Sequence, residues 1–526
     1  MEYPPNYGHV TFDRMRLFPD RIFQIDAATG EEESYGSVLN RSIRLAQALR
    51  AFGLSPGDVV AISGRNHIDI CIPFFAALFN GLPIVGIDTF YKYDEVRAHF
   101  ERSKPKIIFC QNELCDTFAT AAASLSLDIK FVTFDEGDNA MSKFLQMYQT
   151  SEPTEIFKVA EYDIEEIFPF LVCTSGTTGK LKIVAIKNKP LLLKDAFYTK
   201  YSDKSRINKS LFLSPNHWMS FFFAPTLVVA VGGILLLTSK YNNFNYLNVL
   251  HVTDIIKKYR PECALFCMMQ IPSILLEARK NEVDIDMTSL RLITIAGGKL
   301  FDTAHQEFKK LLADNCRILE LYGQTETIGA IFNPSPLRSA RSCGVPTDMH
   351  TVKLIDPDTG VEIKEANVIG ELLVKGPCFS GYYNDPEETA KAFTEDGFYK
   401  SGDLLYRDKD NNYFFVDRLK ASIKYRGTRI YPLQLEEVIR EHPGVADVCV
   451  VGIDGPVELQ KIVACIVKHK GSDVTAQEIK DLVASKLSEN KKLWGGVLYV
   501  DKLPYTSTGK VLKGILEKMA MTAERE

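Results

Sequence analysis

The chain lacks several features that mark specialised classes of protein. Its 526 residues include only two tryptophans, and none of its eleven cysteines forms a Cys-x-x-Cys pair. The odd number of cysteines and their scattered positions argue against a disulfide framework and against a zinc site. The formal net charge is −5, so the chain has no excess of positive charge for gripping nucleic acid. We therefore expect an ordinary globular protein of a reducing compartment.

Signals for export or membrane insertion are also scarce. The first residues contain no basic segment followed by an apolar one, and the last three residues are not Ser-Lys-Leu, so we expect a soluble, cytoplasmic protein. Trp218–Thr238 has no charged residue and is long enough to cross a bilayer. However, Pro225 and the Gly232-Gly233 pair divide it into a helix-like half and a strand-like half, Ile234–Leu237. A buried core segment is therefore favoured over a membrane span.

The pattern of apolar residues predicts an α/β protein of more than one domain, because the chain exceeds what one core usually supports. Apolar runs such as Val59–Ile62, Phe168–Cys173 and Leu292–Ala296 alternate with amphipathic stretches, which predicts largely parallel, buried sheets. After about residue 345, short strands separated by Asp, Gly and Asn turns predict a more antiparallel region. A compact α+β pattern follows the charged stretch at 417–420, and we place a domain boundary there.

One motif predicts a phosphate-binding loop. The run from Thr174 to Lys182 reads Thr-Ser-Gly-Thr-Thr-Gly-Lys-Leu-Lys and follows the apolar strand predicted to end at Cys173. Such a loop can direct several N–H groups and hydroxyls toward a polyphosphate, and a lysine can neutralise charge there. It is not a Walker A loop, because the Gly-x4-Gly-Lys-Ser/Thr spacing is missing. The alternative is a surface turn, since Ser-, Gly- and Thr-rich turns are common.

Three further motifs are weaker when taken singly. Glu320–Thr327 contains an aromatic residue beside a glycine, which can lie against a purine, and a Thr-Glu pair that can hold phosphate and magnesium. Lys400–Asp403, together with Asp417-Arg418, can clamp a ribose. Pro504–Lys510 is a turn that presents a lysine. The alternatives are solvated charges and a surface ion pair.

Together, in this order, the motifs resemble those of the adenylate-forming superfamily, which includes acyl-CoA synthetases, 4-coumarate–CoA ligases, beetle luciferases and adenylation domains. The resemblance extends roughly from Tyr35 to Lys510. It is densest over Gly370–Gly427, where Gly-Glu-Leu, Gly-Tyr-Tyr-Asn-Asp-Pro-Glu, Asp-Gly-Phe and Ser-Gly-Asp occur in family order. Val416–Gly427 is most similar to the luciferase and 4-coumarate ligase branch.

The resemblance implies a fold and a reaction. The fold would be a large N-terminal domain, 1–416, of parallel-rich α/β sheets with a small β-barrel-like region. A hinge at 417–420 and a small mobile α+β domain, 421–526, would follow. A carboxylate would attack the α-phosphate of ATP with Mg²⁺ present, pyrophosphate would leave, and the acyl group would pass to coenzyme A. The expected activity is that of an AMP-forming acid–thiol ligase.

The resemblance also assigns residues. The expected nucleotide-binding residues are Thr174, Ser175, Gly176, Thr177, Thr178, Gly179, Lys182, Tyr322, Gly323, Gln324, Asp403 and Arg418. The expected catalytic residues are Lys510, Thr325, Glu326, His217 and Lys424, with Glu326 as the magnesium ligand. The expected acyl pocket comprises His217, Trp218, Met219, Gly297, Gly298, Gly329 and Ala330. Lys424 and Gly427 would form the coenzyme A tunnel.

The identity of the acid and of the acceptor stays open. No aspartate stands in Pro215–Phe223 to bind an ammonium group, so an apolar fatty or aryl acid is favoured over an amino acid. Leu181 and Ile183 replace the usual Pro and Gly of the phosphate loop, and Asn188 stands where a histidine is common. The alternatives are a luciferase-like or carrier-loading enzyme, and a nucleotide- or acyl-adenylate-binding paralogue without activity. The sequence does not indicate an oligomeric state.

Overall fold

The chain forms two compact units in the computed structural model. The model describes residues 5–175, 181–201, 208–239, 249–267, 270–280, 284–298, 300, 302–333, 342–425, 428–455, 459–505 and 511–526. The larger unit comprises Met1–Asn333, Pro346–Thr351 and Lys375–Tyr399. The smaller unit comprises Pro334–Val345, Val352–Val374 and Lys400–Glu526.

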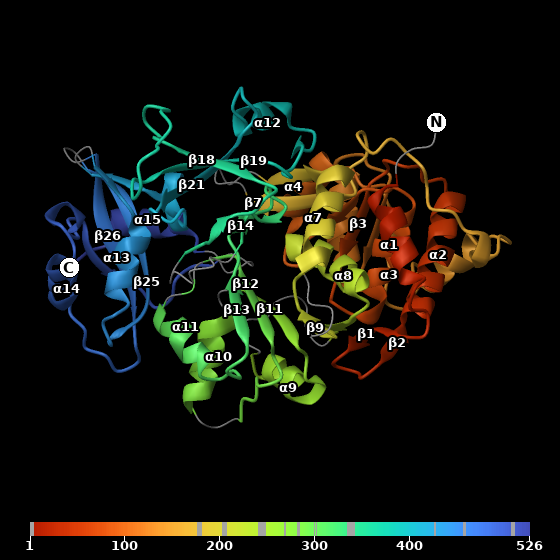
Figure 1. Ribbon diagram of the computed structural model, residues 1–526, viewed down its shortest axis with the longest axis horizontal. Helices are drawn as coiled ribbons and strands as arrows, with labels where there is room; N and C mark the ends of the chain where they lie inside the picture. Colours follow the sequence, from red (N-terminus) through yellow and green to blue (C-terminus); the bar gives the residue numbers. More distant parts are fainter. Residues whose placement is uncertain are drawn as a thin grey trace. The chain divides into compact units, whose positions relative to one another are not determined.

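One seven-stranded sheet of the larger unit is parallel except at one edge, where β1 and β2 pair antiparallel. In spatial order its strands are β13 (Arg317–Glu320), β12 (Leu292–Ala296), β11 (Cys263–Cys267), β9 (Lys209–Phe212), β10 (Ile234–Leu237), β1 (Ile22–Asp26) and β2 (Glu32–Ser34). Its apolar face shares a core with α9 (Val249–Tyr259), α10 (Gln270–Lys280) and α11 (Asp302–Lys309), as seen in Figure 1.

The second seven-stranded sheet of the larger unit carries the strand predicted to precede the phosphate loop. In spatial order its strands are β20 (Gly381–Tyr382), β8 (Leu181–Ile186), β7 (Phe170–Ser175), β4 (Ile84–Gly86), β3 (Val60–Ser63), β5 (Ile107–Cys110) and β6 (Lys130–Thr133). The five strands from β7 to β6 run parallel, whereas β8 is antiparallel to both of its neighbours. Helices α4 (Tyr93–Ser103) and α5 (Cys115–Ser124) contribute to its core. The two sheets confirm the predicted parallel-rich α/β class.

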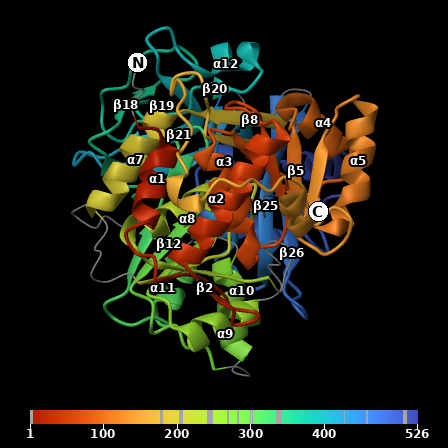
Figure 2. The same cartoon turned by 90° about the vertical axis from the view of Figure 1, so that its right-hand side faces the viewer.

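The remaining helices of the larger unit pack around these sheets. They are α1 (Tyr7–Met15), α2 (Tyr35–Phe52), α3 (Cys71–Phe79), α6 (Met141–Met147), α7 (Asn188–Tyr201), α8 (Met219–Val231) and α12 (Pro386–Ala392). Helices α1, α2 and α3 lie side by side, as Figure 2 shows. Every residue of α3 is buried, which explains why its sequence is apolar all round.

The charge-free stretch is a helix followed by a strand, as predicted. Helix α8 ends at Val231, and Gly232 adopts φ 67°, a left-handed conformation that glycine adopts without steric cost. Strand β10 then begins at Ile234 inside the first sheet. Within the described ranges, no helix has the length and apolarity that a membrane crossing requires.

The smaller unit contains two further sheets. The first consists of β18 (Thr351–Ile355), β19 (Gly370–Lys375), β21 (Tyr399–Arg407) and β22 (Tyr413–Arg418), in that spatial order. The second consists of β24 (Thr428–Ile430), β23 (Ile423–Tyr425), β26 (Leu459–Lys468) and β25 (Val445–Gly455), with β27 (Gly496–Tyr499) paired to β26. The latter is packed by α13 (Pro432–Ile439), α14 (Ala476–Lys486) and α15 (Lys513–Thr522). This is the α+β pattern predicted for the C-terminal part.

The predicted hinge lies inside the smaller unit. Asp417 and Arg418 end β22, and Leu419–Ala421 is a 3₁₀ turn. The Leu433 N–H donates a hydrogen bond of 3.0 Å to Asp417 Oδ2. Because the compact units divide the chain at other positions, motion about 417–420 and the domain limits 1–416 and 421–526 stay predictions.

Candidate active site

The carboxyl edge of the first sheet gathers several of the predicted residues. Strands β9, β11, β12 and β13 are parallel neighbours, so the loops that follow them emerge at one edge. His217, Trp218 and Met219 follow β9, Gly297 and Gly298 follow β12, and Tyr322 follows β13. The Leu321 N–H donates to the Ile295 carbonyl at 2.9 Å, which continues the pairing of β12 and β13 up to the tyrosine.

A tight hairpin holds the Thr325-Glu326 pair. Strands β14 (Gly323–Gln324) and β15 (Gly329–Ala330) pair antiparallel. A Cβ at Gly323 would lie 2.2 Å from the Gly329 carbonyl oxygen, so only glycine allows this close approach. The Thr327 hydroxyl accepts from the Gln324 N–H at 2.9 Å and donates to the Gly329 carbonyl at 2.8 Å. These bonds constrain the turn that carries Thr325 and Glu326.

Glu326, the predicted magnesium ligand, is a buried carboxylate. The Tyr382 hydroxyl donates to its Oε1 at 3.1 Å, and the Phe379 N–H donates to its main-chain oxygen at 2.8 Å. Burial, and secondarily the Glu326 charge, raises the pKa of Tyr382, so the phenol remains a donor. Among the described residues, no three acidic, His or Cys side chains cluster to hold a metal by themselves. A single buried carboxylate of this kind can hold a magnesium ion that takes its other ligands from substrate phosphates and water.

The second sheet positions Lys182 against Tyr382, the tyrosine that contacts this carboxylate. Lys182 on β8 pairs with Thr174 on β7, and Tyr382 on β20 pairs with Val184 of β8. The Lys182 ammonium lies 2.5 Å from Glu388 Oε2 and 4.5 Å above the Tyr382 ring. Tyr382 thus connects Lys182, through its ring, to Glu326, through its hydroxyl. Gly176, Thr177, Thr178 and Gly179 fall outside the described residues, as does the side chain of Ser175.

The two sheets meet at Gly86. A Cβ on this last residue of β4 would lie 2.0 Å from the Asn216 carbonyl oxygen and 2.7 Å from His217 Cα. His217 Nε2 lies 3.4 Å from Asp88 Oδ2, and neither ring nitrogen makes a hydrogen bond within the described part of the chain. Burial lowers the pKa of His217 and the Asp88 charge opposes that shift, which favours a neutral imidazole at neutral pH.

The predicted acyl pocket includes two glycines with a left-handed backbone conformation and the neighbouring rings of His217 and Trp218. Gly297 and Gly329 adopt φ of 90° and 87°, and a Cβ at Gly297 would meet nothing within 4 Å. The Ala330 carbonyl accepts a hydrogen bond of 2.7 Å from Lys194, a fully buried residue of α7. Burial lowers the pKa of Lys194 to about 7. Trp218 is the N-cap residue of α8, and its ring lies edge-on to that of His217.

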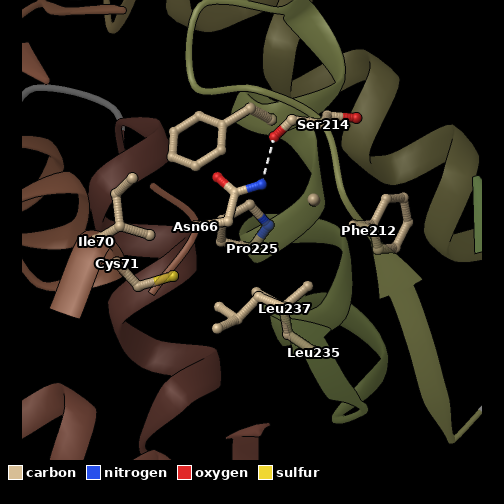
Figure 3. Close-up of a pocket in the computed structure, with 10 residues that line it drawn as sticks. Asn66, Ile70, Cys71, Phe212, Ser214, Pro225, Leu235 and Leu237 are labelled. Carbon is tan, nitrogen blue, oxygen red and sulfur yellow. Dashed lines mark hydrogen bonds between the residues drawn. The ribbon is translucent and has the colours of Figure 1, made fainter. Parts of the chain in front are cut away.

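A small cavity lies close to the loop after β9, as Figure 3 shows. Its volume of about 20 Å³ holds roughly one water molecule. Asn66 Nδ2 donates to the Ser214 carbonyl at 2.9 Å, whereas Asn66 Oδ1 is buried without a partner among the described residues. None of the predicted acyl-pocket residues lines this cavity, which is a packing gap large enough for one water molecule.

The predicted ribose and coenzyme A residues belong to the smaller unit. Asp403 on β21 pairs with Arg418 on β22, and Arg418 Nε lies 2.7 Å from Asp403 Oδ1. Asp403 is 2% exposed, whereas the Arg418 side chain is 43% exposed. Lys424, on β23, lies 3.9 Å from Asp358 Oδ1. Gly427 and Lys510 lie outside the described residues.

Asn188 stabilises the start of α7. It is fully buried, and its Oδ1 accepts hydrogen bonds from the Tyr7 N–H at 3.0 Å and from the Tyr162 hydroxyl at 3.4 Å. Its Nδ2 donates to the Ile167 carbonyl at 3.3 Å. The residue that stands where a histidine is common therefore connects α7 to two other segments.

Sequence reasoning assigned no role to Asp88, Glu388 or Tyr382. Tyr382 lies in the quoted Gly-Tyr-Tyr-Asn-Asp-Pro-Glu motif, and that motif was its only signal. Asp88 and Glu388 contact their partners across the sheets, from positions far away in the chain. No local pattern distinguishes either carboxylate from a solvated surface charge.

Known proteins share both the sequence motifs and the fold. Residues 12–383 match the AMP-binding enzyme family, and residues 434–510 match the AMP-binding enzyme C-terminal domain. Luciferin 4-monooxygenase of Photinus pyralis is 27% identical, over 96% of this chain and 92% of that protein. The 4-coumarate–CoA ligase of Pinus taeda is 28% identical, over 95% of this chain and 92% of that protein.

Solved structures agree with the fold. ATP-bound MatB of Rhodopseudomonas palustris matches with a TM-score of 0.86 at 23% identity, covering 98% of this chain and 99% of that chain. The Bacillus subtilis o-succinylbenzoate CoA synthetase complex with its acyl-adenylate intermediate gives 0.80 at 23% identity, covering 99% of both. These matches confirm the predicted resemblance, and the chain belongs to the AMP-binding enzyme family, part of the adenylate-forming superfamily.

Proposed function

We propose that this adenylate-forming enzyme activates an apolar fatty or aryl acid with ATP and Mg²⁺, releases pyrophosphate, and transfers the acyl group to coenzyme A. The observation that carries the proposal is the chain of contacts from Lys182 through Tyr382 to Glu326. It connects a cationic side chain that follows the predicted phosphate loop to a buried carboxylate through one tyrosine. A polyphosphate and its magnesium ion need this combination of charges.

In this proposal the larger unit holds most of the nucleotide. Lys182 and the loop from Thr174 to Gly179 bind the β- and γ-phosphates, and Tyr322 stacks on adenine beside Gly323 and Gln324. Thr325 contacts the α-phosphate. Glu326 holds magnesium, which, when bound, supplies positive charge that shields the phosphate oxygens from an attacking carboxylate.

The smaller unit would supply the remaining groups. Asp403 and Arg418 bind the ribose, and the Asp403 carboxylate beside an exposed guanidinium supports that assignment. Lys510 places a positive charge between the acid carboxylate and the α-phosphate, where the transition state is most negative. Lys424 and Gly427 line the entry of coenzyme A.

The acid would bind at the carboxyl edge of the first sheet. His217 faces the carboxyl end of the substrate, and its two ring nitrogens have no hydrogen bond within the described ranges. Trp218 and Met219 form one wall, and Gly297, Gly298, Gly329 and Ala330 form the other. Small residues on that wall leave room for an apolar chain or ring, which favours a fatty or aryl acid.

For the acyl acceptor, a second candidate competes with coenzyme A. The luciferin 4-monooxygenase and 4-coumarate–CoA ligase relatives are about equally similar, at 27% and 28% identity. Both names are compatible with a first step that forms an acyl-adenylate. A luciferase-like or carrier-loading enzyme would share that step and differ in what receives the acyl group.

The test is acid-dependent release of pyrophosphate with ATP and Mg²⁺, across fatty and hydroxycinnamic acids, with and without coenzyme A. We expect release stimulated by one class of acid and the matching acyl-CoA by mass spectrometry. Glu326→Gln should lower release by about 10²–10³-fold, as expected when one electrostatic contact to the transition state is lost. Release without acyl-CoA would favour another acceptor. ATP binding without any release across the panel would indicate a binding paralogue.

A further inference from the structure

Lys182 already has an anionic partner in the structure. Its ammonium lies 2.5 Å from Glu388 Oε2, in the first turn of α12, and the two side chains are only 14% and 28% exposed. The Tyr382 ring lies 4.5 Å below the same ammonium. A phosphate that reaches Lys182 therefore meets a cation whose charge a nearby carboxylate offsets.

The start of helix α12 holds Glu388 in place. Asp385 caps α12 and accepts a hydrogen bond of 3.2 Å from the Glu388 N–H. Arg102 on α4 lies 2.7 Å from Asp385, which connects the start of α12 to the second sheet. The carboxylate is thus directed at Lys182 by an anchored helix terminus.

The second oxygen of Glu388 has a cation of its own. Lys391, one turn further along α12 and largely exposed, lies 2.8 Å from Glu388 Oε1. Hydrogen bonds from Lys182, then from Lys391, lower the pKa of Glu388 to about 2, so the carboxylate stays charged throughout the physiological range. When Lys182 turns to another anion, Lys391 remains to neutralise Glu388.

We propose that Glu388 is an internal anion that competes with the β- and γ-phosphates of ATP for Lys182, and so lowers the affinity of the enzyme for ATP. This inference rests on the proposed phosphate-binding role of Lys182. The exchange replaces one carboxylate by polyphosphate oxygens that carry more charge, and Lys391 keeps Glu388 neutralised while it occurs. After pyrophosphate leaves, Glu388 pairs with Lys182 again.

The competition should affect only ligands whose phosphates bind Lys182. ATP and pyrophosphate carry the phosphates that need Lys182, whereas AMP lacks the β- and γ-phosphates. Removing the Glu388 charge should therefore tighten ATP and pyrophosphate binding and leave AMP binding unchanged. A general change in the shape of the site would alter the affinity for all three.

The experiment measures the dissociation constants of ATP, pyrophosphate and AMP, with Mg²⁺ and without acid, by calorimetry. We expect Glu388→Gln to tighten ATP and pyrophosphate about three- to tenfold, as loss of a partly buried ion pair suggests. The KM for ATP should fall while kcat does not rise. The matched control is Glu387→Gln, which removes a neighbouring exposed carboxylate on α12. It should leave the dissociation constants of ATP and pyrophosphate unchanged. Lys391→Met should weaken ATP binding, because Glu388 then holds Lys182 more tightly.

A double-mutant cycle isolates the effect of the Lys182–Glu388 interaction on ATP affinity. In a Lys182→Met background, Glu388→Gln should have no further effect on ATP affinity. Three results would overturn the inference. They are unchanged or weaker ATP binding in Glu388→Gln, an equal gain in AMP affinity, and a gain in ATP affinity that persists in the Lys182→Met background. If wild type and all variants bind no ATP, the proposed function fails as well. If they bind ATP with an affinity that does not change in Glu388→Gln, only this inference fails.

Discussion

His99, on α4, lies beneath the strand that leads to the predicted phosphate loop. Its Nε2 is 3.0 Å from Cys173 Sγ, and its Nδ1 is 3.1 Å from the Ser103 hydroxyl. Burial lowers the pKa of His99 to about 4, and His217 adds to this shift, whereas a hydrogen bond to the Gly86 main chain opposes it. Because the unfolded chain takes up this proton near pH 6.5 and the folded chain does not, stability falls as the pH drops from about 6.5 toward 4.

A His99→Gln variant should therefore lose less stability in mild acid than the wild type. The contribution of this one residue between pH 7 and pH 5 is on the order of 1–2 kcal/mol. The measurement is the decrease in Tm between these two pH values, with His469→Gln, at an exposed histidine, as a control. Equal decreases in wild type and His99→Gln would show that His99 does not contribute to the acid sensitivity.

At the scale of elements, the contact between the end of β4 and the loop after β9 sets the position of His217. The contact is between main chains, so a side chain at Gly86 cannot be accommodated by rotation of a neighbouring side chain. The structure needs glycine here for space, because Gly86 is not among the residues with positive φ.

We predict that Gly86→Ala displaces the 215–218 loop and raises the KM for the acid more than the KM for ATP. A tenfold or larger rise is expected, since small misplacements of positioning groups cost about that much or more. Steady-state kinetics with both substrates measure it. Gly514→Ala on α15, where a Cβ would meet nothing within 4 Å, is the control. An equal rise in both KM values would mean that the damage spreads beyond the loop.

At the scale of the whole molecule, we propose an alternation about the predicted hinge at 417–420. The C-terminal domain first presents Lys510 for adenylation and then presents the face with Lys424 and Gly427 for thioester formation. Lys510→Ala should lower adenylation about 10²–10³-fold, because it removes the positive charge nearest the reacting groups. The same variant should still form thioester from supplied acyl-adenylate. Lys424→Ala should show the reverse pattern. Separate assays of the two half-reactions measure both, and equal loss of both half-reactions in each variant would contradict the alternation.

Much of the fold and part of the site were predictable, because the signals are local. Continuous apolar runs between amphipathic stretches predicted β12 over the same residues, Leu292–Ala296, and β7 within two residues of its bounds. The break at Gly232 separated a helix from a strand because a left-handed residue ends a helix. The order of short motifs indicated the family, and the position of the Thr174–Lys182 run after a predicted apolar strand indicated where a phosphate-binding loop begins.

The sequence by itself determined the α/β class, the family, and the loops at which substrates are expected. Apolar runs and short motifs are local signals, because each one is contained in a few consecutive residues. Only the tertiary structure decided that Glu388 pairs with Lys182, that Asp88 lies beside His217, and that His99 contacts Cys173. These pairs join segments that are distant in the chain. The order of strands in a sheet and the packing of helices on it bring such residues together, and neither is encoded in the pattern around one residue.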